Sequence, residues 1–347
     1  MTTDSVAPRS PHIVIVGAGS IGCYLGGRLL AAGASVTMIG RPRLHQVFET
    51  HPLRVSDYHG FDSAVQLAPY QFTTSPEPVA HADLVLLTVK SAATEDTGRE
   101  IAPLLRPNIP VISFQNGIGN ADRLRPLLPK ASVLAGMVSY NVLQKTPGHF
   151  HQGTEGKLMA EASLALTPEI IAAFNNAGIP LTPRTDMHSV LWSKLLLNLN
   201  NPINALSGLP LKEQLSTRAY RRCLAMAQDE TLSLLKAANI PTIKMAAVPM
   251  EWIPTVMRLP DWLFRRLAQT MLAVDPIARS SMWEDLEAGR KTEIEWINGE
   301  VIRLAKAHGR TAPVNQRLVD LIHQSESGQR QAWPGLALLH ELTKPSA

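Results

Sequence analysis

The feature that most constrains this chain is the stretch from Ile13 to Gly22, where a run of aliphatic residues passes directly into three spaced glycines. Consecutive aliphatic, mostly β-branched residues are typical of a strand that is buried on both faces. The glycines stand at positions 17, 19 and 22, with the spacing Gly-x-Gly-x-x-Gly. In a dinucleotide-binding turn the first glycine allows the tight turn, the second lets a diphosphate approach the backbone, and the third lets the next helix pack on the strand. The stretch therefore predicts such a turn.

The residues that follow complete a strand–helix–strand unit. Residues 21–32 have a helical pattern, Gly33 is placed to end that helix, and residues 34–39 form a second strand pattern. Free N–H groups and the positive end of the helix dipole would then point at a bound anion. The residues expected to bind the phosphates are Gly17, Ala18, Gly19, Ser20, Ile21 and Gly22. The alternative is a glycine-rich turn in an α/β domain that binds no nucleotide.

The end of the second strand bears on the choice of cofactor. An NAD-dependent enzyme usually has Asp or Glu there, which accepts hydrogen bonds from the ribose hydroxyls. Here the run is Met-Ile-Gly-Arg-Pro-Arg, with Arg41 and Arg43 and no carboxylate. A carboxylate would repel a 2′-phosphate, whereas arginine binds one bidentately. The run favours NADP(H), and the alternative is that both arginines are solvated surface charges.

Composition excludes several classes of function. The chain has 347 residues, 45% of them hydrophobic, which suits two domains. The net charge of +4 is spread along the chain without a lysine-rich block, so nucleic acid is not an expected partner. The chain has no apolar run long enough for a membrane span, and its first ten residues lack the apolar core of a signal peptide. Cys23 and Cys223 have no metal-ligand or redox spacing, so we expect no metal and a cytoplasmic protein.

The order of patterns predicts two domains. Strands at residues 82–90, 110–114 and 132–137 alternate with helices, which indicates a parallel, doubly wound α/β sheet. Residues 148–183 are expected to add two antiparallel strands, a helix and a last strand that closes the sheet. Ligands of such sheets bind beyond the carboxyl ends of the strands, where Arg41, Lys90 and Asn116 lie. From residue 186 the patterns are helical, at 187–199, 215–238 and 281–308, so the predicted domains are 1–185 and 186–347.

A polar stripe marks the first of these helices. Lys194, Asn198 and Asn201 fall at i, i+4 and i+7, so in a helix they share a face, and their neighbours are leucines. Such a face suggests a cleft lined with hydrogen-bond donors, where a lysine can donate a proton to a carbonyl oxygen as that oxygen gains negative charge. The alternative is a structural ladder of amides.

Two later stretches are less specific. In the stretch 280–299, Ser281 could cap a helix or bind a carboxylate, and spacing alone does not separate Glu293 from Glu295 as a functional acid. The proline-rich segment 240–274 could be a lid, an oligomer contact or part of the core, and core is the commonest of the three roles.

Taken together, the motifs resemble those of the ketopantoate reductase (2-dehydropantoate 2-reductase) family, from Ile13 to about Asn315. The likeness rests on Gly17-x-Gly19-x-x-Gly22, Thr88-Val89-Lys90, Gln115-Asn116-Gly117-Ile118-Gly119, Leu191-Trp192-x-Lys194-Leu195, Ser280-Ser281-Met282-x-x-Asp285, Thr292-Glu293-Ile294, Ile297-Asn298-Gly299 and Ala307-His308-Gly309. The order and separation of these motifs are more specific than any one of them. The resemblance implies an N-terminal Rossmann-type NADP-binding domain and a C-terminal all-helical domain, as in 6-phosphogluconate dehydrogenase-like proteins.

The resemblance also implies an activity and roles for single residues. The activity is NADPH-dependent reduction of ketopantoate to pantoate, a step of pantothenate and coenzyme A biosynthesis, and a homodimer is a candidate assembly. The implied roles are general acid for Lys194, a place beside that lysine and the nicotinamide ribose for Glu293, the cofactor–substrate junction for Asn116, substrate binding for Asn198 and Ser281, and the NADP end of the cofactor site for Arg41 and Lys90.

Three alternatives stay open under this resemblance. Lys194 and Pro202 are eight positions apart, where many relatives have nine, so the second substrate-binding amide is Asn201 only if a gap is allowed, and Asn200 is its rival. The substrate could be another branched 2-keto acid, for which the same residues would serve. A non-catalytic NADP-sensing protein is the remaining alternative, from another functional class.

Overall fold

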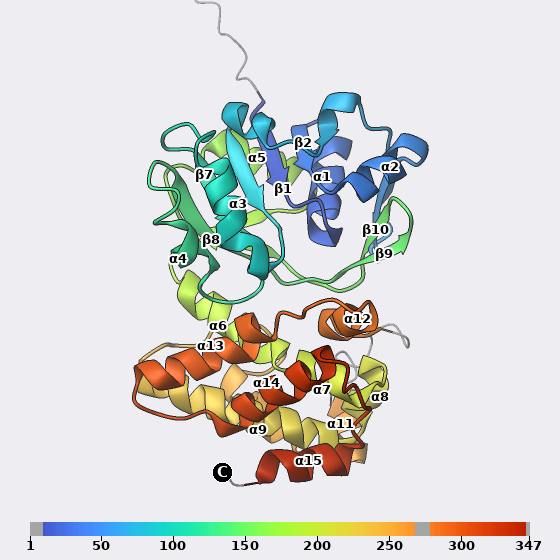
Figure 1. The fold of residues 1–347 in the computed structure, drawn as a ribbon, viewed down its shortest axis with the longest axis vertical. Helices are drawn as coiled ribbons and strands as arrows, with labels where there is room; N and C mark the ends of the chain where they lie inside the picture. Colours follow the sequence, from blue (N-terminus) through green and yellow to red (C-terminus); the bar gives the residue numbers. More distant parts are fainter. Residues whose placement is uncertain (1–9, 268–277, 345–347) are drawn as a thin grey trace, which may run out of the picture. The chain divides into compact units, whose positions relative to one another are not determined.

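The computed structural model describes residues 10–267 and 278–344, which form two compact units. Within the described residues, the first unit comprises 10–115 and 120–187, and the second comprises 188–344 together with the short loop 116–119. The chain therefore passes from the first unit to the second near residue 187, two residues beyond the predicted boundary. Figure 1 shows the elements of both units in sequence colours.

The first unit is built on an eight-stranded sheet with the order β12-β11-β8-β7-β6-β1-β2-β5. All of its neighbouring strands are parallel except β8 and β11, which are antiparallel. The strands are β1 (His12–Val16), β2 (Ser35–Ile39), β5 (Phe72–Thr73), β6 (Leu84–Leu87), β7 (Pro110–Ser113), β8 (Ser132–Val138), β11 (Leu158–Glu161) and β12 (Leu181–Arg184). The predicted doubly wound α/β class is confirmed.

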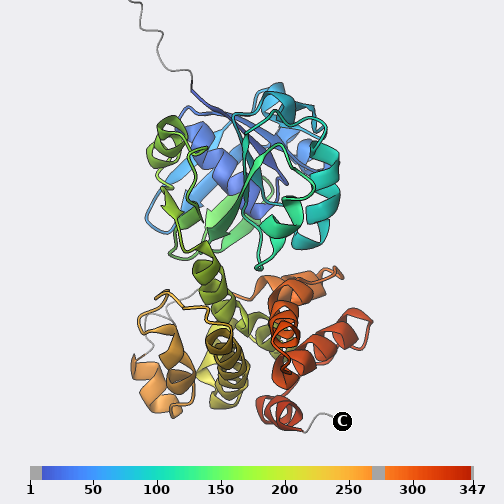
Figure 2. The same cartoon turned by 90° about the vertical axis from the view of Figure 1, so that its left-hand side faces the viewer.

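Helices cover both faces of this sheet, because the strands are apolar on both. In β1, Ile13 and Ile15 point into a core shared with α1 and α5, whereas Val14 and Val16 point into a second core shared with α3 and α4. The helices of this unit are α1 (Ser20–Ala31), α2 (Pro42–Thr50), α3 (Thr94–Ile101), α4 (Asn120–Leu124) and α5 (Pro168–Asn176). Figure 2, turned by 90°, shows helices on either side of the sheet.

A second, four-stranded sheet corrects the expectation for residues 148–183. Its order is β4 (Asp62–Val65), β3 (Leu53–Asp57), β10 (His149–Gln152) and β9 (Val142–Thr146). β10 pairs with β9 and β3, while β11 pairs with β8 in the large sheet, so the predicted pair of antiparallel strands does not form. The reason is that the parallel partner of β10 lies almost a hundred residues earlier in the chain, where local patterns do not reveal it.

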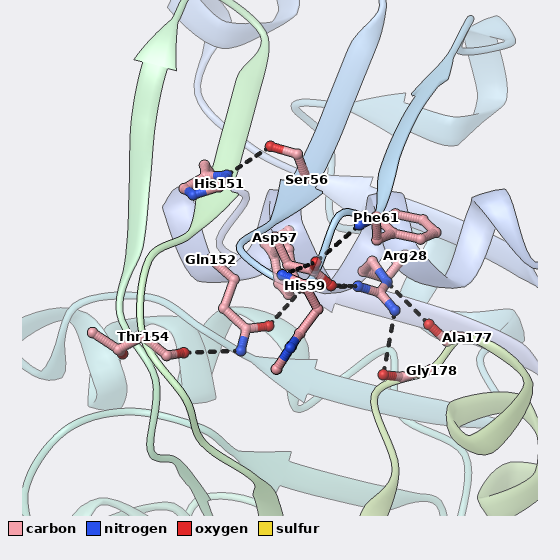
Figure 3. Close-up of polar contacts among 11 residues, drawn as sticks. Arg28, Ser56, Asp57, His59, Phe61, His151, Gln152, Thr154, Ala177 and Gly178 are labelled. Atoms are coloured by element: carbon pink, nitrogen blue, oxygen red, sulfur yellow. Dashed lines mark hydrogen bonds and ion pairs between the residues drawn. The ribbon is translucent and has the colours of Figure 1, made fainter. Parts of the chain in front are cut away.

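The buried Arg28 links the first helix, α1, to the small sheet by hydrogen bonds. Arg28 of α1 donates from Nη1 to the Asp57 carboxylate at 2.8 Å, from Nε to the Ala177 carbonyl at 3.0 Å, and from Nη2 to the Gly178 carbonyl at 3.3 Å (Figure 3). Asp57 also accepts the N–H groups of His59 and Phe61. These bonds satisfy a guanidinium that would be costly to bury alone, and they hold α1 in place behind the glycine turn.

The second unit is helical. Its α-helices are α6 (Met187–Asn198), α7 (Asn200–Ser207), α8 (Leu211–Ser216), α9 (Arg218–Ala237), α10 (Ile253–Met257), α11 (Asp261–Leu267), α12 (Ser281–Glu287), α13 (Ile294–Ala307), α14 (Pro313–Glu326) and α15 (Gly335–Thr343). One hydrophobic core runs through them. The helix expected over 215–238 is divided at Thr217, whose backbone is extended, with φ −102° and ψ 115°. No helix among the described residues combines the length and the apolar character that a membrane span needs.

The described part of the segment 240–274 contributes to this core. Met250, Ile253, Met257 and Phe264 are buried in it. The fully buried Arg221 of α9 holds the segment, since its guanidinium donates to the carbonyls of Leu215, Met257 and Leu259 at 2.9, 3.1 and 2.7 Å. The buried residues of 240–267 therefore belong to the core, whereas Trp252 and Trp262 of the same segment are 64% and 70% exposed. Residues 268–274 lie outside the described residues.

Candidate functional site

The glycine turn has the conformation that its sequence predicts. Gly17 has φ +105°, and a Cβ built there would lie 2.5 Å from the Val89 nitrogen. A Cβ on Gly22 would lie 2.5 Å from the Gly17 carbonyl oxygen and 2.7 Å from the Thr88 hydroxyl oxygen. That hydroxyl donates to the Gly17 carbonyl at 2.7 Å. Positions 17 and 22 therefore admit only glycine without a shift of the backbone or of Thr88.

Gly19 differs from its two neighbours, and this difference fits a bound diphosphate. It is exposed, and no heavy atom of the described residues lies within 4 Å of the place that a Cβ would take. The first helical hydrogen bond of α1 runs from Cys23 N–H to the Gly19 carbonyl at 2.8 Å, so the N–H groups just before Cys23 lack helical acceptors. No described side chain caps this end, and its first turn has no acidic residue. The turn has space and donors for an anion.

The residue directly after β2, Gly40, has no room for a side chain, and the residue that follows it is Arg41. A Cβ on Gly40 would lie 2.5 Å from Phe72 Cζ and 2.8 Å from Ala18 Cβ. The first side chains after the strand that have room are therefore those beyond Gly40. Arg41 and Arg43 are both exposed, Arg41 as the residue that precedes α2. Lys90, three residues after β6, is exposed as well.

Lys194 lies on α6, whose other residues are mostly hydrophobic. Its neighbours Trp192, Leu195 and Leu196 are buried in the core of the second unit. Burial lowers the pKa of Lys194 from 10.5 to about 8, because desolvation disfavours the charged ammonium. A lysine with a pKa near neutrality can give up its proton readily, which is the property that a general acid needs.

The polar stripe beside Lys194 is interrupted. α6 ends at Asn198 and α7 begins at Asn200, with Leu199 at φ −58° and ψ −13° between them. Lys194 and Asn198 thus share α6, but the single helix expected to carry Asn201 on the same face does not continue that far. Asn198 and Asn201 are both half-buried.

The rival amide, Asn200, is engaged elsewhere. It is buried, and its side chain exchanges two hydrogen bonds with Gln214, at 3.2 and 3.1 Å. The side-chain amide of Asn201 makes no such exchange among the described residues, although the backbone carbonyl of Asn201 accepts the Ser280 hydroxyl at 3.2 Å. Geometry therefore favours Asn201 over Asn200 as the amide that is available to a ligand.

Ser280 performs the capping role that the sequence left open for Ser281. Its hydroxyl accepts the Trp283 N–H at 3.2 Å at the start of α12. Ser281 is the first residue of the helix and is exposed. Of the two roles considered for Ser281, capping is wrong and ligand binding stays a prediction.

Burial separates the two glutamates that spacing did not. Glu293 precedes α13, is 7% exposed, and accepts a hydrogen bond from Asn116 Nδ2 at 3.0 Å. The side chain of Glu295 is 45% exposed and lies in ion pairs with Arg303 and His323. The structure thus brings Asn116 and Glu293 together, and Glu295 belongs to the surface.

Gly117, which belongs to a motif of the sequence analysis, and two residues that the analysis passed over, Trp296 and Asn204, hold these groups in place. A Cβ on Gly117, which has φ +98°, would lie 2.7 Å from the Trp296 carbonyl, so the loop 116–119 fits closely on α13. Asn204 is fully buried, accepts the Ser280 N–H at 2.8 Å and donates to the Leu209 carbonyl at 2.9 Å. A third asparagine in the stretch Asn200–Ser207 was the available signal for Asn204. Trp296 gave no signal, since its contact with Gly117 joins distant parts of the chain.

Both cysteines are buried, and they lie far apart in the sequence. The described residues contain no cluster of three or more His, Cys, Asp or Glu side chains that could hold a metal ion. Cys23 and Cys223 are both buried as free thiols, and burial raises the pKa of Cys223 to about 12. That thiol therefore stays protonated at neutral pH and is a poor nucleophile.

Comparison with known proteins agrees with this architecture. The family model described as Ketopantoate reductase PanE/ApbA matches residues 13–163, and its C-terminal counterpart matches residues 186–326. The 2-dehydropantoate 2-reductase of Pyrococcus horikoshii is 29% identical over 320 residues, which are 91% of this chain and 97% of the relative. That of Halobacterium salinarum is 26% identical over 321 residues, 91% of this chain and 99% of the relative. A crystal structure of a PanE/ApbA family ketopantoate reductase from Ralstonia eutropha JMP134 is 30% identical, has a TM-score of 0.78, and is matched over 92% of this chain and 100% of its own.

The Rossmann-type sheet has a glycine turn with room for a diphosphate, and together with the matches above it places the chain among oxidoreductases that use a nicotinamide cofactor. The two family models together cover most of the sequence. The chain belongs to the ketopantoate reductase family, and the predicted resemblance is confirmed.

Proposed function

We propose that this enzyme reduces 2-dehydropantoate (ketopantoate) to pantoate with NADPH. The observation that carries the proposal is Lys194, a half-buried lysine whose pKa burial lowers to about 8, in the same unit as the hydrogen-bonded pair Asn116 and Glu293. The family match supports the substrate class, a small 2-keto acid. The proposal places the enzyme in the cytoplasm, in pantothenate and coenzyme A biosynthesis, with a homodimer as a candidate assembly.

The two units have separate tasks in this proposal. Residues 1–185 bind NADP(H) through the glycine turn, Arg41 and Lys90, and residues 186–347 bind the keto acid. The open face of Gly19 and the N-terminal end of α1 support diphosphate binding, and two exposed arginines after β2 support the 2′-phosphate. When bound, NADPH supplies the hydride that reduces the carbonyl carbon.

Side chains of the protein then donate the proton and bind the substrate. Lys194 donates its proton to the carbonyl oxygen, so that the oxygen becomes the hydroxyl of the product. Asn198 and Asn201 supply amides that hold the substrate, and Ser281 supplies a hydroxyl for its carboxylate. Glu293, fixed by Asn116, is buried near the start of α13 and keeps a carboxylate in the helical unit, where it can balance the ammonium of Lys194.

The direct test is NADPH oxidation with a panel of 2-keto acids that differ in chain length, branching and the presence of a hydroxyl. We expect the highest kcat/KM for ketopantoate, because a site that hydrogen-bonds the substrate hydroxyl rejects analogues that lack it. If a branched acid without the hydroxyl is reduced equally well, the enzyme is a reductase of another 2-keto acid. If none is reduced although NADPH binds, the chain is an NADP-sensing protein.

Cofactor choice is tested by Arg41→Ala. We expect the Kd for NADPH to rise about 10- to 100-fold, the scale of a lost charge-assisted hydrogen bond, with little change for NADH. Isothermal titration with both cofactors measures this difference. Arg54→Ala is the matched control, since Arg54 is a half-exposed arginine of the same unit that pairs with Asp62. Equal losses for NADPH and NADH would contradict recognition of the 2′-phosphate.

A further inference from the structure

The start of α12 is tied to α7 by hydrogen bonds in both directions. The Ser280 hydroxyl donates to the Asn201 backbone carbonyl at 3.2 Å, and the side-chain oxygen of Asn204 accepts the Ser280 N–H at 2.8 Å. Ser280 is buried and Asn204 is fully buried. The two helices are neighbours in the helical unit (Figure 1). The arrangement is specific, because breaking either bond would leave a buried polar group unpaired.

Ser280 serves both helices with a single hydroxyl. Its oxygen accepts the Trp283 N–H at 3.2 Å and so caps α12, while its one hydrogen is donated to Asn201 of α7. The bond to Asn201 spans 79 positions of the sequence. The orientation of the first turn of α12 therefore depends on α7.

Two further bonds fix the path of the chain into α12. The Leu211 N–H donates to the Ala278 carbonyl at 2.8 Å, and Arg279 donates from Nη1 to the Gly208 carbonyl at 2.6 Å. Gly208 ends α7 with φ +67°, in the left-handed region that favours glycine. Three successive residues before α12 are thus bonded to α7 or to the turn between α7 and α8.

This junction brings together two residues of the candidate site. Asn201 is bonded through its backbone to Ser280, which leaves its half-buried side chain to other partners. Ser281 follows Ser280 as the first residue of α12, and it is exposed. The bond between Ser280 and Asn201 therefore links the backbone that carries the Ser281 hydroxyl to the backbone that carries the Asn201 amide.

We propose that Ser280 and Asn204 are positioning residues, which set the spacing between Asn201 and Ser281 and thereby the length of 2-keto acid that the enzyme prefers. The inference rests on the proposed function for the substrate-binding roles of Asn201 and Ser281. Neither Ser280 nor Asn204 acts on the substrate itself. An acid that reaches both substrate-binding residues loses more from a changed spacing than an acid that reaches only one.

The first test compares Ser280→Ala, Ser280→Thr and Thr167→Ala. Ser280→Ala removes the bond to Asn201 together with the cap, whereas Ser280→Thr keeps the hydroxyl and should restore both. Thr167→Ala is the matched control, because Thr167 caps α5 of the other unit by accepting the Ile170 N–H at 3.5 Å. It removes a cap without altering the helical unit.

We expect KM for ketopantoate to rise about tenfold in Ser280→Ala, the scale of one or two lost hydrogen bonds, with kcat within about threefold of wild type. The reason is that the substrate carboxylate does not react, so its binding contributes equally to the ground state and the transition state. Preference for ketopantoate over 3-methyl-2-oxobutanoate, which lacks the hydroxymethyl group, should fall by a similar factor. Ser280→Thr, Thr167→Ala and the Kd for NADPH should stay at wild-type values.

This result separates positioning from stability. A protein that is only less stable loses active enzyme, which lowers the apparent kcat and leaves KM and substrate preference unchanged. Wild-type KM and preference in folded Ser280→Ala would overturn the inference. Asn204→Ala keeps the test decisive if Ser280→Ala does not fold, since it removes the acceptor of the Ser280 N–H and leaves the cap intact. The same change of KM is expected, and its absence overturns the inference.

A second measurement does not depend on turnover. Hydrogen–deuterium exchange of peptides that cover residues 280–287, read by mass spectrometry, should be at least about fivefold faster in Asn204→Ala and unchanged in Thr167→Ala. Unchanged exchange in Asn204→Ala also overturns the inference. A wild-type protein that reduces no keto acid but shows this response would contradict the proposed function and leave the coupling of α12 to α7 standing. Reduction of ketopantoate with an unmoved KM in the variants would contradict this inference alone.

Discussion

Replacing Lys194 by alanine is expected to lower kcat for keto acid reduction by at least about 100-fold, the usual contribution of a positioned proton donor. NADPH binding should persist, because the glycine turn, Arg41 and Lys90, which are proposed to bind its phosphates, lie in the other unit. Steady-state kinetics with a parallel titration of NADPH measures both quantities. Lys212→Ala, at an exposed lysine of α8, is the control and should leave kcat unchanged. An unimpaired turnover number in Lys194→Ala would remove the lysine from its proposed role.

The pH dependence of the wild-type enzyme follows from the same residue. The ammonium carries the donated proton below its pKa and has lost it above, and burial lowers this pKa to about 8. We therefore expect kcat for reduction to be constant on the acidic side of pH 8 and to fall as the pH rises through it. A profile that stays flat to pH 10 would show that another group supplies the proton.

The second large effect is expected in the glycine turn, where neighbouring substitutions should separate stability from binding. Gly17→Ala forces a side chain into a left-handed backbone, with the new Cβ 2.5 Å from the Val89 nitrogen. We expect it to lower the free energy of unfolding by roughly 2–4 kcal/mol, which combines backbone strain with overpacking. Gly19→Ala meets no described atom within 4 Å, so its stability should be that of the wild-type protein. Its NADPH affinity should fall at least about tenfold, because the methyl group occupies the approach of the diphosphate.

Thermal unfolding and NADPH titration of the two variants measure these effects. Gly33→Ala is the control for strain alone, because Gly33 has φ +79° and open space around its Cβ position. It should lose stability by about 1 kcal/mol and keep its affinity for NADPH. If Gly17→Ala is as stable as Gly33→Ala, the contact with Val89 does not matter. If Gly19→Ala binds NADPH normally, the diphosphate does not pass over that position.

Much of the fold could be predicted because its signals are local. The aliphatic run of β1 alternates between two cores, and this double burial is what a continuous apolar strand predicts. The partner of β10 was missed because strand pairing over a long separation depends on tertiary contacts, here on the Arg28 and Asp57 bonds behind the small sheet. The break at Thr217 was missed because helical periodicity continues across it, although the backbone there is extended.

The candidate site was likewise predicted in part and missed in part. The motifs predicted which short stretches matter, but not which of two neighbours faces a ligand. Asn200 is buried and engaged by Gln214 whereas Asn201 is half-buried, and Ser280 is buried and caps α12 whereas Ser281 is exposed. Glu293 and Glu295 differ in burial, since the loop at Asn116 covers one and solvent reaches the other. Each choice depends on a partner from elsewhere in the chain, which spacing does not contain.

The crowding at Gly40 limits how the proposed preference for NADPH could be redesigned. Substituting aspartate at position 40, directly after β2, is the obvious way to bind the ribose hydroxyls of NADH. Phe72 and Ala18 already fill the space that its first carbon would need. A redesign toward NADH would therefore begin one residue later, at Arg41, where the side chain is exposed and can be exchanged without repacking the sheet.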